Sequence, residues 1–251
     1  MPQCALCPND VPQLCLSHII PEPFYAGVYD ANGTFPVFSN KKVGPVMKPQ
    51  QKGFRERLLC PDCEGRFSKW ETYSLGQMFH RTKQPGIDCG HYMEFQLDYD
   101  KFKLFQMSIL WRMGVTSLEV FAEVQLGKKH EERLRRMLLS DDPGSADEYA
   151  CRLAFVAVQQ PKLTDLIIPP KRAKRVQHHA VFFMVVGGML WHYIVSSHTS
   201  RLEEDTVLLK EDGRLRILKD GVVPKHVYMD GVMEVYGRNE DYLAAKHGRV
   251  I

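Results

Sequence analysis

The sequence contains no hydrophobic run long enough to cross a membrane as a helix. Its most apolar stretch, residues 180–195, falls short of the ~20 residues that such a span requires, and Gly187 and Gly188 interrupt it. A signal peptide is absent as well, because a cysteine motif begins at residue 4. We therefore expect a protein of the cytoplasm that has no membrane partner.

An excess of charge of one sign is also missing. The 251 residues include 33 Lys and Arg against 30 Asp and Glu, which gives a formal net charge of +3. The overall charge therefore does not indicate nucleic-acid binding, and any basic surface must be local. The chain also has no internal repeat, glycine-rich phosphate loop or Ser-His-Asp signature, so the pattern does not favour repeat proteins, P-loop enzymes or serine hydrolases.

Cysteine occurs seven times, an odd number, and the spacing does not suggest a disulfide framework. Three of these residues are isolated, which fits a reducing compartment: Cys15, Cys89 and Cys151. The other four form two Cys-x-x-Cys pairs that are separated by residues 8–59: Cys4 with Cys7, and Cys60 with Cys63.

These two pairs predict a metal site. A Cys-x-x-Cys turn bends back on itself and points both sulfurs at one ion, so two such turns supply four thiolates, a set typical of tetrahedral zinc. A catalytic zinc usually keeps one coordination position open. The sequence therefore predicts one structural zinc bound by Cys4, Cys7, Cys60 and Cys63, with any chemistry beside it.

Apolar residues at helical spacing predict a helix from Glu64 to about residue 78, a second over residues 98–113 and a third over 128–139, with a short helix over 118–124. The second helix is apolar on more than one side and should be central. Arg112 lies near its end. A buried guanidinium needs a partner, so we expect a structural ion pair there.

The pattern changes near residue 149. Strand-like segments follow at 149–158, 181–186, 189–195, 207–210 and 214–218, and hairpin turns are indicated at residues 187–188 and 212–213. The expected fold class is α+β. Its parts are a zinc-stapled module over residues 1–82, a helical region over 83–148 and an antiparallel sheet region over 149–251.

Positive charge is concentrated in two segments. One is the second half of a long predicted loop or loose hairpin over residues 26–57, with six basic residues: Lys41, Lys42, Lys48, Lys52, Arg55 and Arg57. This surface could contact phosphates, and a solvated lysine-rich loop is an equal alternative. The other segment, residues 169–175, is expected to be an exposed basic linker before the sheet.

The first Cys-x-x-Cys pair, the box Ser17-His18-Ile19-Ile20-Pro21 and the second pair at the start of a helix occur in an order that resembles the zinc-stapled HNH (ββα-metal) endonucleases. The resemblance covers residues 1–75. It implies that His18 is the general base and that a catalytic Mg²⁺ or Mn²⁺ ion holds the scissile phosphate. Residues 103–112 are similar to a stretch of uncharacterised bacterial proteins that carry such a module.

Three positions depart from the family pattern. Ser17 stands where the family usually has an acidic metal ligand, and Glu64 stands where it usually has Asn or His. A further helix histidine or lysine is replaced by Ser68. Glu64 is a good ligand for a hard cation, and Glu71, two helical turns along on the same face, is a second candidate.

Two functions stay open at this point. The first is a metal-dependent nuclease, a hydrolase of phosphodiester bonds in DNA rather than RNA, with catalytic candidates His18, Glu64, Ser17 and Glu71. The second is a catalytically degenerate zinc module that binds nucleic acid or a partner protein. The geometry of His18, Glu64 and Glu71 should discriminate between them.

Overall fold

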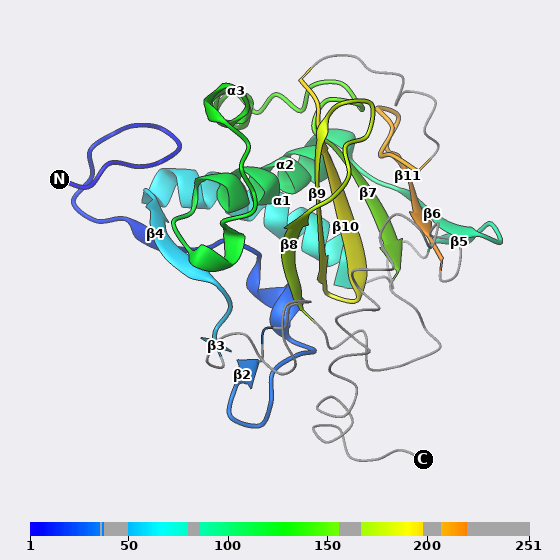
Figure 1. Cartoon of the computed structure of the whole chain (residues 1–251), viewed down its shortest axis with the longest axis horizontal. Helices are drawn as coiled ribbons and strands as arrows, with labels where there is room; N and C mark the ends of the chain where they lie inside the picture. The colour runs from blue at the N-terminus through cyan, green and yellow to red at the C-terminus, as the bar shows by residue number, and fades with distance from the viewer. Residues whose placement is uncertain (36, 38–49, 80–85, 156–166, 198–206, 220–251) are drawn as a thin grey trace.

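A computed structural model describes residues 1–35, 37, 50–79, 86–155, 167–197 and 207–219. This part of the chain contains three α-helices, a seven-stranded sheet and two small two-stranded sheets (Figure 1). The predicted α+β fold class is confirmed.

The helices follow the sequence pattern closely. They are α1 (Pro61–Phe79), α2 (Tyr99–Val115) and α3 (Lys128–Leu139), with short 3-10 turns η1 (Glu22–Tyr25) and η2 (Glu119–Phe121). The carboxylate of Asp98 caps α2 by accepting the backbone N–H of Lys101. Every residue of α2 from Phe102 to Met113 is buried, so α2 is the central helix that its apolar sides predicted.

The large sheet has the strand order β5-β6-β11-β7-β10-β9-β8. Its strands are β5 (Ile87–Asp88), β6 (Tyr92–Gln96), β7 (Ala150–Phe155), β8 (Ile168–Arg172), β9 (Ala180–Val186), β10 (Met189–Val195) and β11 (Arg214–Leu218). The hairpin across residues 187–188 pairs β9 with β10 over their full length, as predicted.

The sheet differs from the prediction in two respects. It includes β5 and β6, which lie in the region 83–148 that was predicted to be helical, and β11 pairs with β7 in parallel, so the sheet is mixed rather than antiparallel. The reason is tertiary: β6 is a short, half-exposed strand that pairs antiparallel with β11, more than a hundred residues further along the chain. Local patterning carries no signal for such a pairing.

Two smaller differences from the prediction concern segments near the sheet. Residues 207–210, predicted as a strand, contribute only an isolated bridge from Leu208 to Arg152. Residues 168–172, at the predicted basic linker, form the edge strand β8. Pro169 and Pro170 are compatible with this position, because an edge strand has one side without a hydrogen-bonding neighbour.

The N-terminal part contains two small antiparallel sheets. In one, β1 (Cys15–His18) pairs with β4 (Arg55–Leu59), and in the other β2 (Thr34–Phe35) pairs with β3 (Gln50–Gln51). The second pair agrees with the loose hairpin predicted within residues 26–57. The first is the strand pair that precedes α1.

Helix α2 joins the parts of the core. It packs against α1 and α3 (Figure 1). The ring of Phe105 in α2 lies 6.2 Å from that of Trp191 in β10. The ring of Phe24 in η1 meets the same Trp191 at 5.4 Å. One continuous apolar cluster therefore connects the N-terminal segment, the helices and the sheet. No described helix is long and apolar enough to cross the membrane.

A buried lysine on α2 gives a prediction for stability. Lys103 is 1% exposed, and its Nζ donates to the carbonyl of Ala146 at 3.1 Å. Burial lowers its pKa from 10.5 to about 8. Between these pH values the folded protein holds fewer protons than the unfolded chain, so its free energy of unfolding should rise by about 3 kcal/mol as pH increases.

The substitution Lys103→Met should remove this rise, measured by urea unfolding at pH 7.5 to 10. Lys128→Met, at an exposed position at the start of α3, is the control and should retain it. An unchanged pH dependence in Lys103→Met would show that the lysine is not the group responsible.

Candidate functional site

The four predicted zinc ligands come together. The sulfur atoms of Cys4, Cys7, Cys60 and Cys63 all lie within 4.8 Å of one another. The sulfurs of Cys7 and Cys60 are 3.6 Å apart, close to the edge of about 3.8 Å expected for a tetrahedron with Zn–S bonds of about 2.3 Å. The cluster could therefore hold a metal ion, and among the described residues it is the one group of three or more such donors.

Backbone hydrogen bonds fix the first cysteine turn against the second. The N–H of Cys60 donates to the sulfur of Cys4 at 3.3 Å, and the N–H of Ala5 donates to the carbonyl of Leu58 at 3.1 Å. Burial and the neighbouring thiols raise the pKa of Cys63. Four thiols packed this closely are hard to deprotonate without a nearby cation. A divalent metal ion would stabilise the thiolates, so the cluster is chemically suited to bind one.

The cluster closes a ββα unit. Strand β1 runs antiparallel to β4, with Cys15 opposite Leu59 and His18 opposite Arg55. Cys60 then connects β4 to α1, and Cys63 lies in the first turn of that helix. Two strands, a helix and the thiol cluster therefore form one compact unit, with His18 at the end of β1.

The ring of His18 has two polar partners. Its Nε2 forms a hydrogen bond with the carbonyl of Lys52 at 3.0 Å and lies at ion-pair distance, 2.9 Å, from Oε2 of Glu22, and the side chain is 29% exposed. Because the Lys52 carbonyl can only accept a hydrogen bond, we assign the proton to Nε2. This tautomer leaves the lone pair on Nδ1, the nitrogen that can take up a proton.

Glu22 was not among the residues singled out from the sequence. It lies four residues after His18, in η1, between Pro21 and Pro23. The hydroxyl of Tyr29 donates to its Oε1 at 2.5 Å. Burial, and secondly the Glu22 carboxylate, raise the pKa of Tyr29, so this hydroxyl stays protonated as a donor.

The turn beside His18 depends on one glycine. Lys52 and Gly53 both have positive φ, 57° and 69°. A Cβ on Gly53 would lie 2.8 Å from Cε2 of Tyr25, so only glycine fits without a shift of that ring. The turn brings the Lys52 carbonyl to His18.

Ser17 and Glu64 form a separate pair. The Ser17 hydroxyl is fully buried and donates to Oε2 of Glu64 at 2.5 Å. Neighbouring residues of a strand point to opposite faces, so β1 directs Ser17 to α1 and His18 away from it. Ser17 therefore contacts Glu64, whereas His18 contacts Glu22.

Glu71, the third acidic candidate, pairs with a cation. Its Oε1 lies 2.6 Å from the Nη2 of Arg112, whose side chain is 1% exposed. This is the ion pair expected for Arg112. The Nη1 of the same guanidinium donates to the carbonyl of His18 at 2.6 Å.

The basic segment can be placed only in part. Lys52 is exposed, Arg55 is half-buried, and Arg57 is exposed and donates to the carbonyl of Leu14 at 2.9 Å. Lys41, Lys42 and Lys48 lie outside the described residues.

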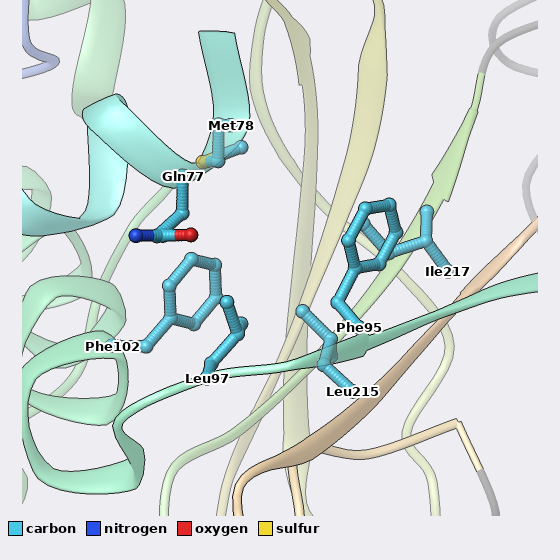
Figure 2. Close-up of a pocket in the computed structure, with 7 residues that line it drawn as sticks. All are labelled: Gln77, Met78, Phe95, Leu97, Phe102, Leu215 and Ile217. Carbon is cyan, nitrogen blue, oxygen red and sulfur yellow. The ribbon is translucent and has the colours of Figure 1, made fainter. Parts of the chain in front are cut away.

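A pocket lies apart from these groups, between the end of α1, the start of α2 and strands β6 and β11 (Figure 2). Its lining is apolar apart from one amide: Gln77, Met78, Phe95, Leu97, Phe102, Leu215 and Ile217. It offers no acid, base or cation to a polar substrate, so the candidate site remains the ββα unit.

Comparison with known proteins adds no assignment: no family model matches the chain, and neither the curated proteins nor the solved structures give a significant match. The site is therefore judged on its geometry.

Cys60→Ser should abolish metal binding, because Cys60 lies at the junction of β4 and α1 and its loss opens the tetrahedral set. The free energy of metal binding is also folding free energy, so stability should fall strongly. Elemental analysis of freshly purified protein should find one zinc per chain in the wild type and none in the variant. Cys89→Ser, at an exposed cysteine outside the cluster, should keep the metal, and a metal-free wild type would refute the prediction.

Proposed function

We propose that the chain is an HNH-like metal-dependent nuclease that cleaves phosphodiester bonds, in DNA rather than RNA, with His18 as general base. The observation that carries the proposal is the position of His18. It ends the first strand of a ββα unit closed by four thiols, and its ring is fixed through Nε2 by Glu22 and Lys52. Its other nitrogen is left to accept a proton.

The role of Glu22 follows from its contact. When Nδ1 takes a proton from the attacking water, the imidazole becomes positively charged. A carboxylate at 2.9 Å from Nε2 stabilises that charge, as the acidic member of a catalytic triad does for its histidine, while the hydrogen bond to the Lys52 carbonyl orients the ring. Tyr29 holds the carboxylate in turn.

Glu64 is the proposed ligand for the catalytic Mg²⁺ or Mn²⁺. Ser17 engages its Oε2 and so leaves Oε1 for a cation. Mg²⁺ is commonly bound through one or two carboxylates together with substrate phosphate oxygens, so a single glutamate fits this role. When bound, the ion would stabilise the leaving oxygen. Glu71 is the weaker candidate, because Arg112 already neutralises it.

A binding module without catalysis is the second candidate function, with nucleic acid or a partner protein as the ligand. Three observations favour it. Ser17 replaces an acidic ligand and donates its hydroxyl to Glu64, and the charge of Glu71 is matched by Arg112. In addition, the His18 ring and the Ser17–Glu64 pair lie on opposite faces of β1. Such a module would keep the scaffold and the basic residues beside β4 but hydrolyse nothing.

His18→Ala should lower the rate of plasmid nicking about 10²- to 10⁴-fold in Mg²⁺ or Mn²⁺, because it removes the base. Zinc content and DNA binding should change little. His178→Ala, at an exposed histidine outside the ββα unit, is the matched control and should keep the wild-type rate. A wild type that binds DNA yet cleaves neither plasmid nor single-stranded substrates with either ion would support the binding module instead.

Lys52→Ala tests the basic segment, because the Lys52 side chain is exposed and its main-chain carbonyl, which the substitution keeps, is the hydrogen-bond partner of the His18 ring. If its ammonium contacts a phosphate, the variant should bind all DNA sequences more weakly. The slope of log K against the logarithm of the salt concentration should also become smaller in magnitude by about one. Lys69→Ala, at an exposed lysine on α1, should leave both quantities as in the wild type. Equal salt slopes for Lys52→Ala and the wild type would remove Lys52 from the interface.

A further inference from the structure

The guanidinium of Arg112 links three segments that are distant in the sequence. It donates from Nη1 to the carbonyl of His18 at 2.6 Å, and its Nη2 pairs with Glu71 at 2.6 Å. Its Nε returns to the carbonyl of Ser108 in its own helix at 3.2 Å. Arg112 therefore connects β1, α1 and α2 through one rigid group.

Because Arg112 is buried, its guanidinium depends on these contacts to satisfy its charge and its N–H donors. The Arg112 side chain is 1% exposed and lies over the ring of Phe67, 5.3 Å from its centroid. A buried cation is tolerated only when its donors are satisfied. The guanidinium presents its donors in a fixed planar fork, so it sets the positions of its acceptors relative to one another. Lysine carries the same charge but has no such fork.

His18 is thus restrained at both its side chain and its main chain. Glu22 and the Lys52 carbonyl hold the ring, while Arg112 holds the carbonyl. The next residue is fixed as well, because the N–H of Ile19 donates to the carbonyl of Phe54 at 2.9 Å. A movement of the His18 peptide would swing the ring away from Glu22.

We propose that Arg112 is a positioning residue for His18: it fixes the peptide from which the imidazole projects and so keeps Nε2 at Glu22 and the Lys52 carbonyl, with Nδ1 as the proton acceptor. This inference rests on the proposed function of His18 as base. It assigns to a helix outside the ββα unit a part in aligning the base. An ion pair with only a structural role would affect stability and nothing else.

The test compares two arginine-to-lysine variants. Arg112→Lys keeps the charge but loses the fork. Arg135→Lys is the matched control, because Arg135 on α3 also donates to a main-chain carbonyl of the N-terminal segment, that of Leu6 at 2.7 Å, and pairs with a glutamate, Glu132. The readouts are zinc content, the tautomer of His18 by ¹⁵N NMR of histidine-labelled protein, and kcat and KM for plasmid nicking in Mg²⁺ or Mn²⁺.

In Arg112→Lys we expect retained zinc, a His18 ring shifted away from the single Nε2–H tautomer, and a kcat about 10- to 100-fold lower at unchanged KM. Arg135→Lys should match the wild type in tautomer and kcat. A folded Arg112→Lys protein with the wild-type tautomer would overturn the inference. A shifted tautomer in a protein whose wild type nicks no DNA would uphold the positioning role and count against the nuclease.

A second variant covers the case in which Arg112→Lys does not fold. Ser108→Ala removes only the hydroxyl that lies 3.4 Å from Nη2 of Arg112 and leaves the charge in place. The His18 tautomer should shift in the same direction but less. If Arg112→Lys does not fold and the His18 tautomer is unchanged in Ser108→Ala, the inference is overturned.

Discussion

The N-terminal half depends on one short-range constraint, the meeting of four thiols from residues 4–7 and 60–63. Closing a loop over the intervening segment costs chain entropy, and a metal ion bound only by the closed form would offset that cost. With the sulfurs within 4.8 Å of one another, β1 must lie beside β4 and α1 must begin where β4 ends. The placement of His18 follows from this closure.

The ββα unit is not isolated from the rest of the protein. Arg112 of α2 reaches the carbonyl of His18, and Arg135 of α3 reaches that of Leu6, so both other helices hold main-chain atoms of the unit. The ring of Phe24 also packs against Trp191 of β10, which joins the N-terminal segment to the sheet. The three segments inferred from the sequence therefore share one core, and the proposed alignment of His18 depends on one helix outside its own segment, α2.

The acidic residues around β1 explain why two functions compete. Each carboxylate has a defined partner: Glu22 faces His18 and Tyr29, Glu64 accepts from Ser17, and Glu71 pairs with Arg112. One partner is an imidazole, one a hydroxyl and one a permanent cation, so the three carboxylates differ in what they can still bind. Glu64 retains the greatest capacity for a cation. A site with one carboxylate that no cation neutralises can support metal-assisted hydrolysis only if the substrate phosphate completes the ligand set.

The sequence by itself determined the features that depend on local pattern. Helical periodicity placed α1, α2 and α3, the glycine pair placed the β9–β10 hairpin, and the two Cys-x-x-Cys turns identified the cluster, because each signal lies within a few residues. Only the tertiary structure decided what His18, Ser17 and Glu71 contact and that β6 joins β11. Most of those contacts join segments that are far apart in the chain, so they depend on how the core packs. The contact between His18 and Glu22 is local, but it depends on the shape of the turn between them, which the sequence pattern did not predict.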